Sequence, residues 1–176
     1  MSSIHIITSR FNNSTWSENC TFRERHNYKG CIYCSPQQIT EKIPQHSLIF
    51  VIEMNNSTNK IEGIGLIRNV TRHDKKLGVY EAGNYNRYTY IGKYRVDRST
   101  LEQTIPKILQ IIEQILFKGK THLKRGGGFT RIPEKLYKHH RIEELYSYTE
   151  LQIKEELAGL FKRRFSETGD FAMAMS

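Results

Sequence analysis

A glycine-rich basic segment, residues 118–133, carries the residue types best suited to binding a phosphate. Consecutive glycines leave backbone N–H groups free to converge on an anion, and arginine can hold a phosphate through two parallel hydrogen bonds. The residues concerned are Lys124, Arg125, Gly126, Gly127, Gly128 and Arg131. The segment therefore predicts a phosphate clamp, with a solvated basic loop as the alternative. It lacks the residue order of a nucleotide-triphosphate loop.

A second segment, residues 79–96, alternates tyrosines with cationic side chains. Aromatic rings can stack on single-stranded or flipped bases while Arg and Lys hold the neighbouring phosphates. The candidate cations are Arg87 and Lys93, and the candidate rings are Tyr85, Tyr88, Tyr90 and the single tryptophan, Trp16. The alternative is an ordinary sheet in which the tyrosine rings are buried, with Trp16 packed on the edge of the core.

The three cysteines raise the question of a metal site. Together with one histidine they offer thiolate and imidazole ligands of the kind that zinc prefers: Cys20, His26, Cys31 and Cys34. If residues 30–34 form a strand, Cys31 and Cys34 point to opposite faces and cannot share an ion. We therefore predict no metal and no cofactor, with the cysteines acting as small apolar side chains.

Length and charge limit the class of protein. The chain has 176 residues, which suits one domain, and its 27 Lys and Arg against 18 Asp and Glu give a net charge of +9. This excess predicts a polyanionic partner, most often nucleic acid. We expect no membrane segment and no secretory signal, and hence reduced thiols in the cytoplasm or nucleus.

The hydrophobic pattern predicts strands at 4–8, 30–34, 47–54 and 60–67, with a polar loop over 9–29. The strand at 47–54 is apolar on both faces, which is typical of a central strand in a covered sheet. Gly63 and Gly65 lie on one face of the next strand, where they indicate a bulge or a place where another backbone or a ligand comes close.

The second half of the chain has a helical pattern. An apolar stripe over 101–116 predicts a helix, with a capping box at 99–102 or, alternatively, a start near Thr104 with Pro106 in the first turn. Another capping box at 147–150 precedes a second helix. We expect one domain over residues 1–165 and a flexible tail over 166–176.

Four segments carry a resemblance to a known superfamily: residues 6–19, Gly30–Pro36, the hairpin Leu48–Gly65, and Gly92–Val96 followed by Lys124–Pro133. They resemble PUA-like domains, especially the YTH and EVE branches, over about residues 4 to 135. The resemblance implies an α/β (α+β) fold with a mixed β-barrel or strongly bent sheet flanked by helices. The cage tryptophan of YTH domains aligns with Ile32, so Tyr33, Trp16 or the Tyr85–Tyr90 group would line a differently built pocket.

The resemblance implies a non-enzymatic reader of a single-stranded or flipped base, modified bases included, with RNA favoured over DNA as the partner. One alternative is a structural or interaction protein, for example a viral assembly component, with its basic face on an acidic protein partner. Another is a nuclease or RNA-modifying enzyme using some of these residues: Asp74, Asp97, His122, His139 and His140. The composition, rich in Asn, Ile and Lys, favours a large DNA virus as source, with the virion as a further location.

Overall fold

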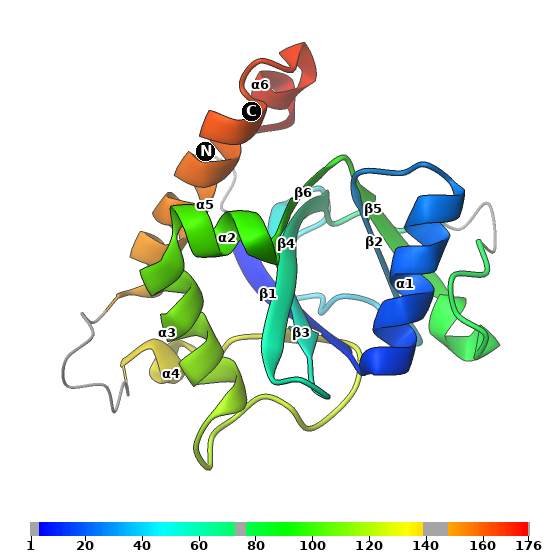
Figure 1. Cartoon of the computed structure of the whole chain (residues 1–176), viewed down its shortest axis with the longest axis horizontal. Coiled ribbons are helices and arrows are strands. Elements are labelled where there is room, and N and C mark those ends of the chain that lie inside the picture. Colours follow the sequence, from blue (N-terminus) through cyan, green and yellow to red (C-terminus); the bar gives the residue numbers. More distant parts are fainter. Residues whose placement is uncertain (1–3, 73–76, 139–147, 176) are drawn as a thin grey trace.

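The computed structural model describes residues 4–72, 77–138 and 148–175. The fold is α+β, as predicted: a five-stranded mixed sheet and a two-stranded ribbon with helices on either side (Figure 1). The strands are β1 (His5–Phe11), β2 (Cys31–Ser35), β3 (Leu48–Asn55), β4 (Lys60–Arg68), β5 (Tyr88–Gly92), β6 (Tyr94–Asp97) and β7 (Phe129–Arg131). The helices are α1 (Asn13–Arg25), η1 (Gly83–Asn86), α2 (Arg98–Thr104), α3 (Pro106–Phe117), α4 (Glu134–Lys138), α5 (Glu150–Phe165) and α6 (Gly169–Met175).

The main sheet has the strand order β6-β4-β3-β1-β7, in which β1 and β3 are parallel and the other neighbours are antiparallel. The ribbon is the antiparallel pair β2 and β5. Of the two expected sheet forms, the closed barrel is not formed by the described residues, because β6 and β7 end the sheet at opposite edges. None of the helices in the described part of the chain is long and apolar enough to cross a membrane.

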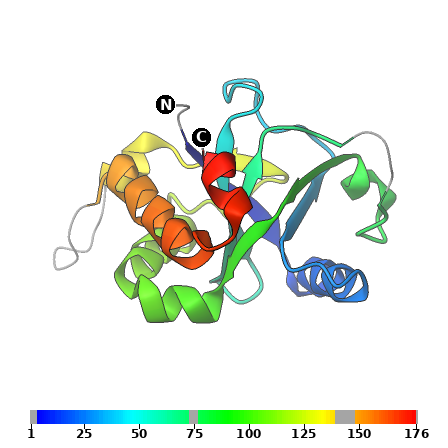
Figure 2. The same cartoon turned by 90° about the horizontal axis from the view of Figure 1, so that it is seen from above.

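Strand β3 is the centre of the fold, and every one of its residues is buried. Phe50 and Ile52 pack on the side of α3 and α5, whereas Ile49 and Val51 pack on the side of the ribbon and α1. Figure 2 shows α5 and α1 on opposite sides of the sheet. Burial on both faces explains the continuous apolar run and confirms the prediction of a central strand.

The helical side is a conventional apolar core. The ring centroids of Phe50 and Phe161 lie 5.1 Å apart, which joins the centre of the sheet to α5. Helix α3 begins with Pro106 in its first turn, as the second of the two alternatives predicts. Helix α2, however, is capped by Asp97 rather than Ser99, because the Asp97 carboxylate accepts a hydrogen bond from the Thr100 N–H.

Helix α5 is capped two residues later than the predicted box. Its cap is Thr149, which exchanges hydrogen bonds with Gln152. Ser147, the predicted cap, lies outside the described residues. Beyond α5, residues expected as a tail form α6, where Phe171 is 2% exposed and packs edge-on against Tyr94.

The prediction of a polar loop over residues 9–29 is wrong. Residues 9–11 complete β1, and Asn13–Arg25 form α1 behind a capping box between Asn12 and Thr15. The sequence pattern concealed this helix because its polar and apolar side chains are spread around the helix without an apolar stripe. Its buried residue, Asn19, is polar, so tertiary contacts rather than periodicity hold the helix in place.

Candidate nucleic-acid interface

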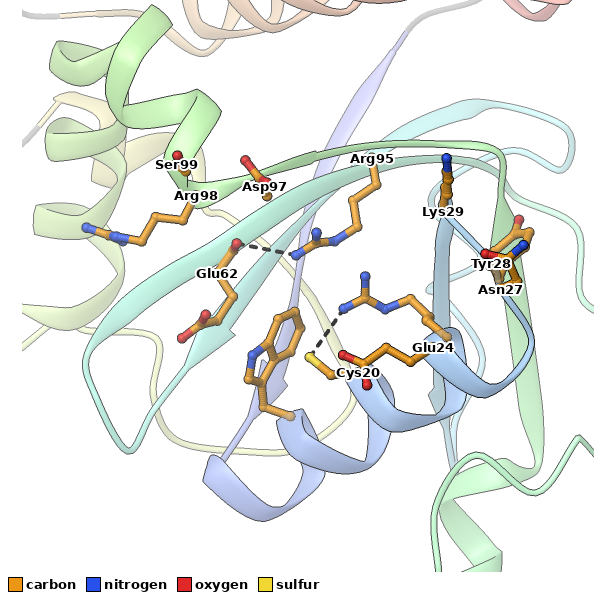
Figure 3. Close-up of a pocket in the computed structure, with 12 residues that line it drawn as sticks. Cys20, Glu24, Asn27, Tyr28, Lys29, Glu62, Arg95, Asp97, Arg98 and Ser99 are labelled. Carbon is orange, nitrogen blue, oxygen red and sulfur yellow. Dashed lines mark hydrogen bonds between the residues drawn. The ribbon is translucent and has the colours of Figure 1, made fainter.

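A pocket of about 640 Å³ lies between α1 and the strands β4 and β6 (Figure 3). Helix α1 and the segment after it form one wall, and residues of β4, β6 and α2 form the other. Its lining residues are Trp16, Cys20, Arg23, Glu24, Asn27, Tyr28, Lys29, Glu62, Arg95, Asp97, Arg98 and Ser99. This volume is within the roughly 300–1,000 Å³ that small-molecule sites occupy.

Trp16 brings an aromatic ring into this pocket. The ring is half-buried, and Phe11 packs edge-on against it with a centroid separation of 5.1 Å. The guanidinium carbons of Arg23 and Arg95 lie 5.4 Å and 5.5 Å from the centre of the ring. The negative face of an indole attracts cations at this range, so the ring and the two guanidinium groups form one unit.

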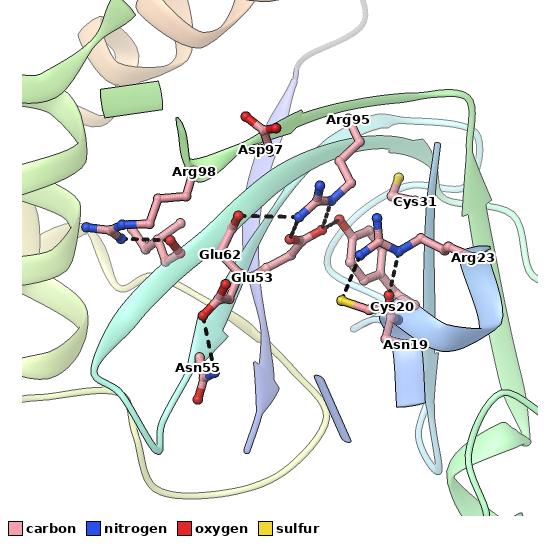
Figure 4. Close-up of polar contacts among 12 residues, drawn as sticks. Asn19, Cys20, Arg23, Cys31, Glu53, Asn55, Glu62, Arg95, Asp97 and Arg98 are labelled. Atoms are coloured by element: carbon pink, nitrogen blue, oxygen red, sulfur yellow. Dashed lines mark hydrogen bonds and ion pairs between the residues drawn. The ribbon is translucent and has the colours of Figure 1, made fainter. Parts of the chain in front are cut away.

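Arg95 is held by a buried polar network on the strand side of the pocket (Figure 4). Its Nε donates to Glu53 Oε1 at 2.9 Å, and its Nη2 donates to Glu53 Oε2 at 2.7 Å. The Tyr33 hydroxyl donates to Glu53 Oε1 at 2.7 Å, and the Glu53 side chain is only 2% exposed. The bidentate pair fixes the plane of the Arg95 guanidinium beside Trp16.

The ionisation of this network follows from burial and pairing. Burial alone would lower the pKa of Arg95, but the Glu53 carboxylate outweighs it, and the pKa rises. Burial raises the pKa of Tyr33 well above its ordinary value, so its hydroxyl keeps its proton and donates a hydrogen bond to Glu53. Arg95 therefore stays charged inside the protein.

Two glycines of β4 make room for the network. A Cβ on Gly63 would lie 2.5 Å from Arg95 Nη2 and 2.8 Å from Glu53 Oε2. A Cβ on Gly65 would collide with the Tyr33 hydroxyl. The close approach predicted for a backbone or a ligand is made mainly by side chains, together with the Val96 carbonyl, which would lie 2.8 Å from a Cβ on Gly63. The predicted bulge is present too, because the register of β3 and β4 shifts between Glu53 and Met54.

Arg23 is a residue of the pocket that the sequence pattern did not indicate. Its Nε donates to Asn19 Oδ1 at 2.9 Å, and its Nη2 donates to Cys20 Sγ at 3.4 Å. Asn19 is itself fixed, because its amide donates to the Ile32 carbonyl at 2.9 Å. Within residues 4–72, 77–138 and 148–175, no carboxylate forms an ion pair with Arg23, so its charge in the pocket is not neutralised. The helical spacing of Asn19 and Arg23 could have indicated this pair only if α1 had been recognised.

The tyrosines predicted for the base pocket lie apart from Trp16. Tyr33 and Tyr90 are each 1% exposed, and the Tyr90 hydroxyl accepts a hydrogen bond from the Ile39 N–H at 3.0 Å. Tyr88 is half-buried, and Tyr85 is 44% exposed. Of the five predicted rings, Trp16 alone lines the pocket.

The two cations predicted in the same stretch also lie outside the pocket. The Arg87 guanidinium lies over the Tyr88 ring, 5.2 Å from its centroid. The exposed Lys93 Nζ lies 3.5 Å from a carboxylate oxygen of Asp170. A surface pair of this kind adds little stability.

The glycine-rich loop lies at the end of the sheet where the parallel strands β1 and β3 finish (Figure 1). Arg10 of β1 holds it, because the Arg10 Nε donates to the Leu123 carbonyl at 2.7 Å. Asn56 holds it as well, through a hydrogen bond of 3.1 Å to the Lys124 carbonyl. Gly126 and Gly128 have φ angles of +92° and +71°, which only glycine adopts readily.

The loop residues differ in their setting. Lys124 is half-buried, whereas Arg125, Gly126 and Gly127 are exposed. Arg131 is in β7, paired with Ile7, and is therefore part of the sheet edge rather than of the loop. The structure thus groups Lys124 and Arg125 with the glycines and sets Arg131 apart.

The candidate zinc ligands occupy separate environments. Cys20 lines the pocket, and the His26 Nδ1 lies 2.8 Å from the Phe22 carbonyl. Burial raises the pKa of Cys31 to about 12 and that of Cys34 to about 11. Among the described residues, no group of three or more His, Cys, Asp or Glu side chains is placed to hold a metal.

The residues of the enzyme alternative are either engaged or outside the described ranges. Asp97 caps α2, and His122 Nδ1 accepts a hydrogen bond from the Lys124 N–H at 3.3 Å. Asp74, His139 and His140 lie outside the described residues. Asp97 and His122 are therefore engaged with backbone N–H groups rather than with a nucleophile.

Comparisons with known proteins give little further information. No protein-family model matches the chain, and no curated protein matches it. Among solved structures, the chain is similar to the YTH domain of Zygosaccharomyces rouxii MRB1 protein in complex with N6-methyladenosine RNA. The identity is 14%, the match covers 85% of this chain and 91% of that chain, and the TM-score is 0.35. At that TM-score the likeness assigns neither a family nor a site. Membership of the PUA-like superfamily and a viral source both stay predictions.

Proposed function

We propose that this chain is a non-enzymatic nucleic-acid-binding module, with RNA favoured over DNA. One single-stranded or flipped base, which includes modified bases, enters the pocket beside Trp16. The glycine-rich loop holds the phosphate backbone of the neighbouring nucleotides. The observation that carries the proposal is a half-buried indole ring flanked by two oriented guanidinium groups in one pocket.

The chemistry of the pocket fits an anionic aromatic ligand. A base can stack on the indole or on a guanidinium plane, and each such contact contributes roughly 1–3 kcal/mol. Arg23 offers a positive charge without a carboxylate partner among the described residues, and Arg95 is oriented by Glu53 before any ligand arrives. The Arg95 charge is balanced by Glu53, so it is Arg23 that can attract an anionic group of the ligand.

The helix that carries Trp16 and the glycine-rich loop are both bound by the β3–β4 turn. Trp16 lies in the first helical turn of α1, where its N–H donates to the Asn12 carbonyl at 2.9 Å. Asn13, which follows Asn12, donates its N–H to Ser57 Oγ at 3.0 Å. The neighbouring Asn56 donates to the Lys124 carbonyl of the loop. These contacts support a shared binding surface that runs from the pocket over the β3–β4 turn to the loop. A nucleotide at Trp16 would place its flanking phosphates near Lys124 and Arg125.

The test uses the fact that Trp16 is the only tryptophan of the chain. Quenching of its fluorescence by single-stranded RNA, by DNA and by oligonucleotides with modified bases would report entry into the pocket directly. We expect Arg23→Ala to weaken quenching at least tenfold. The control variant Lys162→Ala/Arg163→Ala removes two exposed cations of α5 and should bind normally.

The outcomes separate the alternatives. Binding that leaves Trp16 fluorescence unchanged and is equally weakened by the α5 control would show a non-specific basic surface and contradict the pocket. The absence of binding to every oligonucleotide at low salt would contradict the function itself and favour an acidic protein partner.

A further inference from the structure

We propose that the pocket prefers guanine, whose Watson–Crick edge donates two hydrogen bonds to the Glu62 carboxylate. This inference rests on the proposed function and names the base that the site accepts. It depends on the one pocket carboxylate that is both anchored and open to a ligand.

The pocket contains three carboxylates with different settings (Figure 3). Asp97 is engaged as the cap of α2, through its hydrogen bond from the Thr100 N–H. Glu24 is an exposed residue on α1. Glu62 lies on the opposite wall, on β4, and is half-buried.

Glu62 is anchored at both its backbone and its side chain (Figure 4). Its carbonyl accepts a hydrogen bond of 3.3 Å from Arg95 Nη2, and its Oε1 accepts one of 3.2 Å from Asn55 Nδ2. Asn55 is only 2% exposed, and its Oδ1 accepts a hydrogen bond from the Ser57 N–H. These contacts hold the carboxylate while leaving acceptor positions of its two oxygens available.

Guanine is the base whose edge matches this acceptor. Its N1–H and N2–H₂ groups are adjacent donors and can meet the two oxygens of one carboxylate. Adenine and cytosine place an amino group beside a ring-nitrogen acceptor, and uracil places its N3–H between two carbonyl acceptors, so each sets a lone pair against the carboxylate. Contacts of this type to base edges are what give a protein its base specificity.

Protonation state removes the remaining competitor. Protonated cytosine also has two adjacent donors, but cytosine is neutral near neutral pH and would have to take up a proton to bind in this way. Guanine already carries both donors in its neutral form, so it satisfies the carboxylate without that cost.

The experiment measures Trp16 quenching by RNA pentamers UUXUU, where X is guanine, hypoxanthine, adenine, cytosine or uracil. A bidentate base contact is worth roughly 1–3 kcal/mol, so we expect the guanine pentamer to bind about tenfold or more tightly than those with adenine, cytosine or uracil. The hypoxanthine pentamer keeps N1–H but lacks the 2-amino group, and it should bind with intermediate affinity.

Two variants test the residue itself. Glu62→Gln should reduce guanine affinity to that of adenine, whereas Glu24→Gln, the matched change on the other wall, should keep the guanine preference. Glutamine retains an oxygen for Asn55, and thermal unfolding would check that the fold is intact.

Each result decides between the two proposals. Quenching of equal strength by all five pentamers, a preference for another base, or a guanine preference that survives Glu62→Gln would overturn the guanine inference and leave the binding function standing. No quenching by any pentamer, together with no binding of longer RNA, would overturn both.

Discussion

The two faces of β3 show how one strand can serve stability on one side and recognition on the other. Toward α3 and α5, residues Phe50, Ile52 and Met54 join a continuous apolar core. Toward the ribbon and α1, Ile49 and Val51 begin a similar apolar face, but the next position on that face is Glu53. A buried carboxylate therefore takes a place where an aliphatic side chain would suit packing better.

The difference indicates what each face is for. A buried ion pair is often no more stable than a well-packed apolar replacement, so stability alone does not explain Glu53 and Arg95. The pair does fix a charged guanidinium beside Trp16, at the wall of the pocket. On the helical side the ion pairs Arg98–Glu113 and Lys154–Glu150 are more exposed than this one, and the aromatic contact of Phe50 with Phe161 fills space in an apolar core.

The largest loss of stability is expected from removing Glu53, one partner of the buried Glu53–Arg95 pair. Glu53→Ala should lower the free energy of unfolding by about 3–5 kcal/mol, because it leaves Arg95 charged and buried without its partner. The double variant Glu53→Met/Arg95→Met should recover most of this loss in urea unfolding while RNA no longer quenches Trp16. A double variant as unstable as the single one would show that the network is required for the fold.

A loss of stability of similar size on the helical face of β3 should leave RNA binding intact. Phe161→Ala should cost about 3–5 kcal/mol of unfolding free energy, since the ring is 0% exposed and its loss leaves a cavity. The folded fraction should bind RNA with unchanged affinity in fluorescence titrations below the unfolding temperature. Reduced affinity of the folded protein would mean that the two faces are coupled.

A smaller loss of stability is expected from adding a side chain at Gly65, next to the network of Tyr33, Glu53 and Arg95. Gly65→Ala should cost about 1–3 kcal/mol, because its methyl group would meet the buried Tyr33 hydroxyl and Cys31 Sγ. Gly127→Ala is the matched control, since no atom lies within 4 Å of a Cβ there. Thermal unfolding of the two variants compares them directly, and equal stability would contradict the close packing described for β4.

The smallest effect on stability is expected in the basic loop. Lys124→Ala/Arg125→Ala should change the free energy of unfolding by less than about 0.5 kcal/mol, because the loop is held through backbone carbonyls rather than these side chains. The slope of log affinity against log salt should fall by about 2, roughly one for each lost phosphate contact. An unchanged slope in the folded variant would remove the loop from the interface.

The sequence by itself determined the parts of the fold that depend on local pattern. The continuous apolar run of β3 required burial on both faces, and Pro106 set the first turn of α3. Gly63 and Gly65 indicated a bulge or a close approach on β4, and both are present. The composition also indicated the basic charge, and the single tryptophan was a candidate from the start.

Only the tertiary structure decided which residues meet. Helix α1 has no apolar stripe, so its presence depends on capping at Asn12 and on the buried contacts of Asn19. Without that helix, neither the pocket nor the position of Arg23 beside Trp16 could be inferred. The partnership of Glu53 with Arg95 spans 42 residues and forms because β4, lying between β3 and β6 in the sheet, has glycines where the two side chains cross it. Periodicity describes which way a side chain faces, whereas the partner that it finds there is set by the order of the strands.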